Sequence, residues 1–176
     1  MRIMLVALLL TLAGCGATLQ TYETLQQQFD RELATHDGGQ VLRIYRTADL
    51  PNAFGKADVF GGKVNKGFTE VRFQGIRADG RVVFRVTEIE TQSTETTMSR
   101  YGGSTSTLSA QRIGNQVSGT ITTFAAPHGS TELLPPNTTQ FAIDLNRSRE
   151  FTVSGVKVQV LDATETSLRY LLQRTL

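Results

Sequence analysis

Alternation of apolar and polar residues over short runs is the feature that most constrains this 176-residue chain. Residues 69–74 and 82–86 each carry Val, Thr or Phe at every second position, and the dipeptide Asp79-Gly80 stands between them. The side chains of a strand point to alternate faces, and Asp-Gly between two such runs is typical of a β-hairpin. These residues therefore predict two antiparallel strands, each buried on one face.

The same alternation recurs along the rest of the chain. Gly114-Asn115 and Ser154-Gly155 are expected turns between runs, and the 24 threonines suit pleated, half-buried surfaces. No run of helical periodicity separates these strands, so the fold class we predict is mainly β, an antiparallel β-sandwich or a small barrel. The further strands are expected in residues 40–46, 107–113, 116–124, 141–145, 156–160 and 168–172.

One segment near the N-terminus has a different period. Its apolar residues are spaced by three and four, which is the stripe of an amphipathic helix. Thr18 is a suitable N-cap, Gly38-Gly39 is a stop signal, and His36 would sit near the helix C-terminus, where a cation interacts favourably with the dipole. We therefore predict a helix over 18–37 that packs on the sheet. The stripe consists of Leu19, Tyr22, Leu25, Phe29 and Leu33.

Composition excludes several classes of protein. The chain is 39% hydrophobic and 19% charged, which is unlike a collagen, a coiled coil or a disordered tail. Its 18 basic and 16 acidic residues give a net charge of +2, and a dedicated nucleic-acid binder would show a basic stripe. Two histidines and one cysteine leave few residues for metal binding or nucleophilic catalysis. We therefore expect no nucleic-acid partner, no metal site and no catalytic residue.

The first fifteen residues have the order of a secretory signal. Arg2 precedes the apolar stretch Ile3–Leu12, and the small residues Ala13 and Gly14 follow before Cys15. The apolar stretch is about half of the ~20 residues that a membrane-spanning helix needs. The sequence therefore predicts a cleaved signal peptide over residues 1–14 rather than a membrane-spanning anchor.

The tetrad Leu12-Ala13-Gly14-Cys15 resembles the lipobox of bacterial lipoproteins. The resemblance implies a diacylglycerol on the Cys15 sulfur, cleavage before Cys15, and acylation, for instance by palmitate, of the new amino group. This covalent lipid is the only cofactor-like group we expect, and its acyl chains would bind the membrane. Since Gly16 rather than Asp follows the cysteine, the resemblance also implies the outer membrane, and we expect the domain to face the periplasm.

The expected organisation of the chain follows from these segments. Residues 1–14 are the signal peptide, and residues 15–17 are the lipidated N-terminus with a short linker. Residues 18–176 form a single β-rich domain that begins with the helix over 18–37. Burial of acyl chains contributes about 0.8 kcal/mol per CH₂, so two or three chains would hold this domain on a membrane almost permanently.

Residues 47–67 form the longest stretch without clear periodicity, and such loops are often functional. Aromatic side chains beside cations are able to contact a protein, a glycan or a lipid headgroup. The alternative is that the two phenylalanines fold into the core. The candidate contact residues are Phe54, Lys56, Phe60, Lys63 and Lys66.

Three pairs of residues invite a catalytic or metal-binding interpretation. His128 and Ser130 lie close in sequence, but the chain lacks the G-x-S-x-G turn of a nucleophilic serine. Glu88 and Glu90 share a strand face, an arrangement that paired glycosidase carboxylates also use, but the sequence has no aromatic-rich stretch to line a cleft beside them. The third pair is Asp49 and Asp58, and its spacing matches no calcium-binding loop.

The sequence thus favours a lipoprotein with a soluble periplasmic β-domain that binds or scaffolds other proteins of the cell envelope. The alternative is a periplasmic carrier that holds a lipid or another apolar ligand in a curved sheet or barrel. A periplasmic hydrolase is the interpretation that the sequence favours least.

Overall fold

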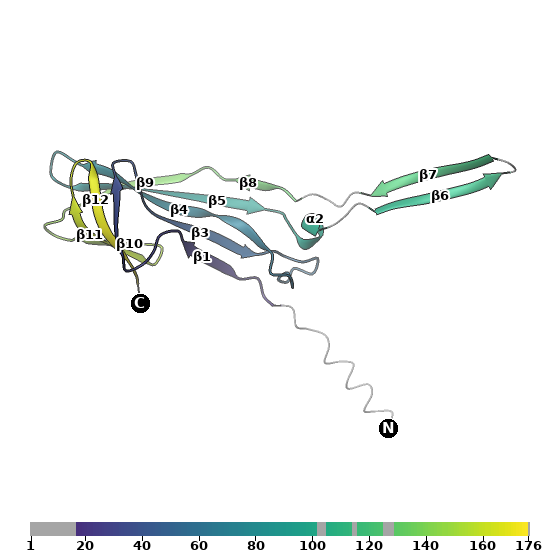
Figure 1. Cartoon of the computed structure of the whole chain (residues 1–176), viewed down its shortest axis with the longest axis horizontal. Helices are drawn as coiled ribbons and strands as arrows, with labels where there is room; N and C mark the ends of the chain where they lie inside the picture. The colour runs from purple at the N-terminus through teal and green to yellow at the C-terminus, as the bar shows by residue number, and fades with distance from the viewer. Residues whose placement is uncertain (1–16, 102–104, 114–115, 125–128, 176) are drawn as a thin grey trace, which may run out of the picture. The chain divides into compact units, whose positions relative to one another are not determined.

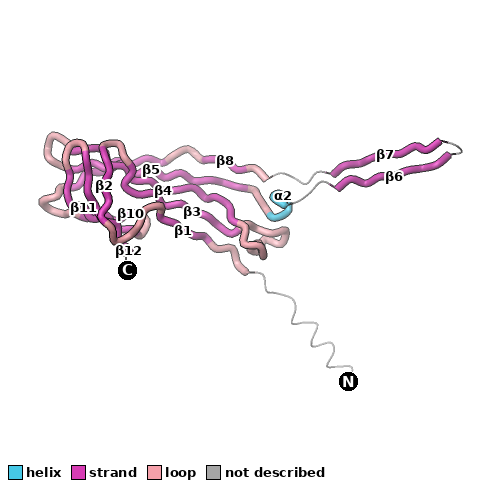
Figure 2. The backbone as a smooth tube through the Cα atoms, in the orientation of Figure 1, coloured by secondary structure: helices cyan, strands magenta, loops and turns pink. Residues whose placement is uncertain are grey.

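A computed structural model describes residues 17–101, 105–113, 116–124 and 129–175. Figures 1 and 2 show that these residues are mainly β, and that the helix α2 (Thr97–Tyr101) is short. The strands are β1 (Thr21–Leu25), β2 (Glu32–His36), β3 (Gln40–Asp49), β4 (Lys63–Ile76), β5 (Val82–Ser93), β6 (Thr105–Ile113), β7 (Gln116–Phe124), β8 (Thr131–Leu133), β9 (Asn137–Ile143), β10 (Glu150–Val153), β11 (Val156–Ala163) and β12 (Ser167–Arg174).

The strands form three sheets. The six-stranded sheet has the order β1-β3-β4-β5-β8, and β9 also pairs with β5. The four-stranded sheet has the order β10-β11-β12-β2, and β6 pairs with β7 as a separate hairpin. The paired strands of the four-stranded sheet are antiparallel throughout, as are the pairs β4–β5 and β5–β9. Each sheet formed by the described strands has two edges, so they do not close into the small barrel that the sequence left open.

The chain divides into two compact units. Unit 1 comprises residues 1–20, 48–64 and 93–131, and unit 2 comprises residues 21–47, 65–92 and 132–176. Among its described side chains, unit 1 has a small apolar cluster of Ala48, Leu50 and Val64. The single β-rich domain over residues 18–176 that the sequence predicts stays a prediction.

Unit 2 contains the main hydrophobic core, to which both larger sheets contribute. Phe84 of β5 lies against Phe151 of β10, with the ring centroids 4.6 Å apart, and Phe151 also meets Phe141 edge-on. Each large side chain that is fully buried contributes about 1.5–3 kcal/mol, so this shared core holds the two sheets together. Its buried members are Val41, Leu42, Ile44, Val71, Phe73, Val82, Phe84, Val156, Val158, Val160, Leu168, Tyr170 and Leu172.

The structure contradicts the helix predicted over 18–37. Residues Thr21–Leu25 form β1 and residues Glu32–His36 form β2, and the two strands belong to different sheets. Each strand pairs on one side with the edge of its sheet, and both contribute apolar side chains to one core, so tertiary pairing and packing override the local period. His36 accordingly lies opposite Ser167 of β12, where there is no helix end for it to cap.

The strands predicted from alternation are confirmed, with shifted ends. The Asp79-Gly80 turn joins β4 and β5, and Gly80 has the positive φ of +81° that such a turn needs. Ser154 and Gly155, with φ values of +46° and +71°, make the turn between β10 and β11. The hairpin expected around Gly114-Asn115 is the pair β6–β7, in which Ile113 lies opposite Gln116. The turn residues themselves, 114–115, lie outside the described residues.

Candidate functional site

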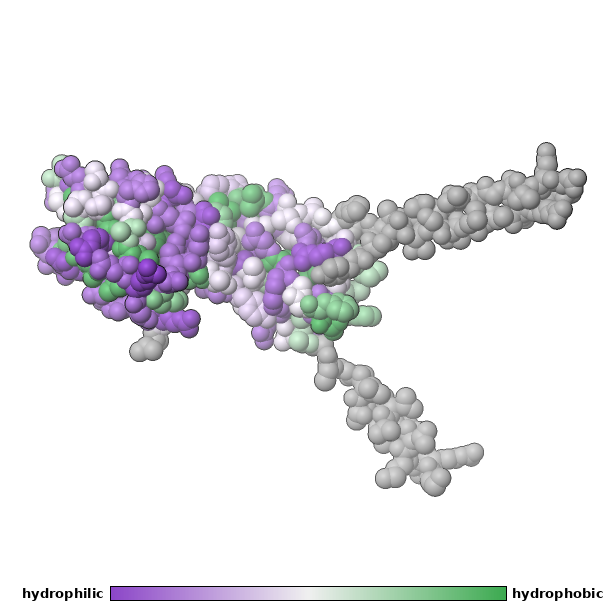
Figure 3. All heavy atoms as spheres, viewed as in Figure 1, coloured by the Kyte–Doolittle hydropathy of each residue, from purple (hydrophilic) through white to green (hydrophobic). Residues whose placement is uncertain are grey.

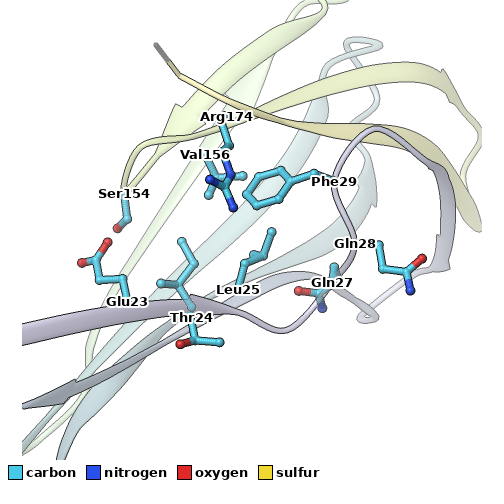
Figure 4. A pocket seen from close by; sticks show the side chains of 10 residues that line it. Glu23, Thr24, Leu25, Gln27, Gln28, Phe29, Ser154, Val156 and Arg174 are labelled. Carbon is cyan, nitrogen blue, oxygen red and sulfur yellow. The ribbon is translucent and has the colours of Figure 1, made fainter.

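A cavity with a volume of about 730 Å³ lies in unit 2 (Figure 4). Leu25 and Phe29 approach it from β1 and the segment that follows β1, and Val156 approaches it from β11. Ile44 of β3 completes the apolar part of the wall. Polar and charged side chains make up the remainder: Glu23, Thr24, Gln27, Gln28, Ser154 and Arg174.

The segment between β1 and β2 is held in place by contacts with both sheets. The Gln27 side chain accepts a hydrogen bond from the Arg43 backbone N–H, at 3.0 Å, and the Asp30 backbone N–H donates to the Leu172 carbonyl, at 2.9 Å. The Arg174 guanidinium lies over the Phe29 ring, 5.0 Å from its centroid, as a cation–π pair. Apolar side chains beside the Arg174 guanidinium and the Glu23 carboxylate suit a molecule that has an apolar body and a polar end.

A second surface feature is the connection between β3 and β4, residues 50–62 in unit 1. Its side chains Phe54, Val59 and Phe60 are 89%, 86% and 84% exposed. Figure 3 shows hydrophobic atoms gathered on the surface over this connection. The phenylalanines therefore do not fold into the core. Val59, which sequence reasoning passed over, belongs with them because it is the neighbour of Phe60.

Backbone hydrogen bonds give this connection a defined conformation. The Asn52 side-chain oxygen accepts from the backbone N–H groups of Phe54 and Lys56, at 2.9 and 3.0 Å. The buried Asp58 carboxylate accepts from the N–H groups of Phe60 and Gly62, at 3.1 and 3.0 Å. The exposed apolar side chains thus lie on two turns that side-chain hydrogen bonds hold in a defined conformation.

Of the five candidate contact residues, only Phe54, Lys56 and Phe60 lie in this connection. Lys63 is the first residue of β4, and its ammonium group forms an ion pair with Asp49. Lys66 belongs to unit 2, where it lines a cavity of about 350 Å³ together with Arg46 and Glu90. The structure therefore brings three of the five together. The two lysines of β4 are not part of the connection.

The candidate catalytic and metal-binding pairs have structural roles where they are described. Ser130 exchanges hydrogen bonds with Thr94, whereas His128 lies outside the described residues. Asp49 is occupied by Lys63, and Asp58 by the two backbone N–H groups already named. Within the described ranges no three His, Cys, Asp or Glu side chains gather into a group that could hold a metal ion.

The two glutamates of β5 share a face, as the sequence predicts. Glu88 lies opposite Thr69 of β4 and Asn137 of β9, and Glu90 lies opposite Gly67. In unit 1, a hydrogen bond from the Arg100 guanidinium lowers the pKa of the Glu95 carboxyl. Glu95 also accepts a hydrogen bond from Thr131, at 2.9 Å, so this carboxylate ties three segments of unit 1 together.

Sequence reasoning missed the cavity of Figure 4. Its walls come from residues 23–29, from β3 and from the C-terminal strands, and no local pattern links segments so far apart. The expected lipidation site, Cys15, lies outside the described residues. In the part of the chain that is described, no helix has the length and hydrophobicity needed to cross a bilayer.

Comparison with known proteins finds no matching family model, no matching curated protein and no matching solved structure.

Proposed function

We propose that this protein is a lipoprotein, held on a membrane by acyl chains on Cys15, whose β-rich body binds other components of the cell envelope. The observation that supports this most is the path of the chain just after the lipobox. The Ala17 carbonyl accepts a hydrogen bond from the Ala57 N–H, at 3.0 Å, and the Gln20 N–H donates to the Asp49 carboxylate, at 2.9 Å. A lipid on Cys15 would therefore be joined directly to a folded unit.

A binding role fits the chemistry of the described surface better than a catalytic one. Exposed apolar side chains on well-ordered turns are typical of contact surfaces. The cavity of unit 2 has Glu23 and Arg174 as its titratable side chains among otherwise apolar, amide and hydroxyl groups. The body we propose is a β-sandwich, since β3, β4 and β5 of one sheet share a core with β11 and β12 of the other. Gly16 after the cysteine favours the outer membrane, on the periplasmic side.

The tether is tested by metabolic labelling of cells that express the chain with its own first residues. We expect an alkyne analogue of palmitate to label the wild-type protein, and Cys15→Ser to abolish the label and the cleavage before residue 15. Label retained by Cys15→Ser would place the lipid elsewhere. A wild-type protein without label would contradict the proposal.

A second candidate function, carriage of an apolar ligand, is favoured by the cavity beside Phe29 and Arg174. Its volume of about 730 Å³ lies in the usual range for small-molecule sites, roughly 300–1,000 Å³. If a fatty acid binds there, Arg174→Ala should weaken binding by about tenfold, because a charge-assisted hydrogen bond is lost. Arg169→Ala, on the same strand but paired with Glu32, is the matched control. Equal affinities for all three proteins would remove this candidate.

A further inference from the structure

The connection between β3 and β4 has an unusual surface for a chain segment of its length. Phe54, Val59 and Phe60 are each more than four-fifths exposed. Lys56 is the exposed ionisable side chain of residues 50–62, since the Asp58 carboxylate is buried beneath two backbone N–H groups. Large apolar groups with one cation and no exposed acid match the interface of a bilayer, where apolar side chains reach the acyl boundary and cations meet lipid phosphates.

The conformation of the connection keeps these side chains outward without the help of a partner. The Leu50 N–H donates to the Gly62 carbonyl and the Asp58 N–H donates to the Leu50 carbonyl, at 2.8 and 2.9 Å. Gly55 and Gly61 have φ values of +70° and +73°, which allow the two tight turns. A surface that is already ordered loses little conformational entropy when it binds.

The position of the connection along the chain identifies what it would meet. The Ala57 N–H, in the middle of the connection, donates to the Ala17 carbonyl at 3.0 Å. Only Gly16 stands between Ala17 and Cys15, so the Cα atom of Cys15 lies within about 7 Å of that of Ala17. The headgroup layer of a bilayer is roughly 5–8 Å thick on each side. A lipid on Cys15 would therefore bring residues 50–62 to the membrane surface.

We propose that residues 50–62 form a second membrane contact, with Phe54, Val59 and Phe60 inserted at the headgroup boundary and Lys56 beside lipid phosphates. This inference rests on the proposed lipidation of Cys15 and names the bilayer as the occupant of this surface. The lipid holds the protein on the membrane, and the inserted side chains fix how unit 1 faces it. Without them, the lipid alone would link unit 1 to the membrane.

The test uses the full lipidated chain in vesicles of phosphatidylethanolamine and phosphatidylglycerol. With Cys15 acylated, Phe60→Cys introduces the sole thiol, which is labelled with an environment-sensitive fluorophore. We expect a blue-shifted emission that spin-labelled lipid quenches. The same labelled protein without vesicles is the control and should show neither effect. Adding Phe54→Ser and Val59→Ser should reduce the blue shift at position 60, and since all three side chains are exposed these changes leave the fold intact.

The possible outcomes separate the two proposals. The mass spectrum of the labelled sample reports acylation of Cys15 independently. A protein without acyl chains would contradict the proposed lipidation. An acylated protein whose probe at position 60 stays in water would overturn the membrane contact alone. A blue shift that is already present without vesicles would mean that a protein surface covers the connection, and it would overturn the contact as well. A blue shift at position 60 that Phe54→Ser and Val59→Ser leave unchanged would show nonspecific adsorption, and would also overturn the contact.

Discussion

Among the glycines in the described part of the chain, Gly67 has the closest contact with the backbone of a neighbouring strand. Its φ is +105°, and a Cβ atom built there would lie 1.8 Å from the Ile89 carbonyl oxygen. The Asn65 side chain accepts a hydrogen bond from the Gly67 N–H, at 2.8 Å, which fixes this conformation. Strand β4 can therefore continue past residue 67 only because that residue has no side chain.

Comparison of two glycines separates this steric clash from backbone strain. Gly80 also has a positive φ, +81°, but a Cβ atom there would meet nothing within 4 Å. We expect Gly80→Ala to lower the free energy of unfolding by about 1–2 kcal/mol, the cost of a left-handed conformation. Gly67→Ala should lower it by about 3–5 kcal/mol, because the Ile89 carbonyl must also move. Equal losses in urea unfolding experiments would contradict the steric argument.

Tyr170 makes the free energy of unfolding of unit 2 fall at alkaline pH. Its side chain is 2% exposed, its hydroxyl donates to the Val41 carbonyl at 2.7 Å, and burial raises its pKa to about 12. The unfolded chain has a tyrosine pKa of about 10. Since the folded value is the higher one, the protonated hydroxyl stabilises the fold fully below pH 10, and this stability is lost between pH 10 and pH 12.

The prediction for Tyr170→Phe follows from that sign. The variant should be less stable than wild type near neutral pH by about 1–2 kcal/mol, because the Val41 carbonyl loses its partner. It should also lose less stability than wild type between pH 9 and pH 11.5, as followed by urea unfolding. Tyr45→Phe, at an exposed position, is the control and should keep the alkaline loss of the wild type. An unchanged alkaline loss in Tyr170→Phe would contradict this interpretation.

At the scale of elements, the connection between β3 and β4 depends on one buried carboxylate. Asp58 accepts hydrogen bonds from Phe60 through Oδ1 and from Gly62 through Oδ2. Asp58→Ala should speed hydrogen exchange of both amides by about tenfold or more, because both acceptors are removed. Asp58→Asn keeps Oδ1, so the Phe60 amide should stay protected from exchange, whereas the Gly62 amide should exchange faster. Exchange rates that do not change in either variant would mean that the turns form without this side chain.

Strands and turns were predictable because their signals are local. A period of two and a turn dipeptide are read from neighbouring residues, which is why residues 69–74 and 82–86 were assigned correctly. The helix predicted over 18–37 was wrong because its evidence was equally local. Leu25, Phe29 and Leu33 are packed against the core of unit 2, but from a strand, a crossing segment and a second strand. Pairing between distant strands decided the outcome, and a single sequence does not encode it visibly.

Part of the candidate contact surface was also predictable. Phe54 and Phe60 stood out because aromatic side chains beside cations are able to form a contact surface, and their exposure supports the choice. Lys63 and Lys66 did not belong with them, because β4 begins at Lys63. The expected loop over 47–67 is correspondingly shorter, since Thr47–Asp49 still belong to β3 and Lys63–Gly67 already belong to β4.

At the scale of the whole molecule, the account depends on how the chain is attached to its surroundings. Fixed contacts of Ala17 and Gln20 with unit 1 mean that any group on Cys15 is held close to the fold. The proposed membrane contact of residues 50–62 depends on that attachment, because a protein released freely into solution would have no bilayer beside this surface.

The intact mass of the mature protein, purified from cell membranes, tests this attachment most directly. We predict a chain that begins at residue 15 and carries the added mass of a diacylglycerol and, with the amino group modified, a further acyl chain. The Cys15→Ser variant should retain residues 1–14. A mature wild-type chain with a free thiol at position 15, or one that begins at another residue, would contradict the account.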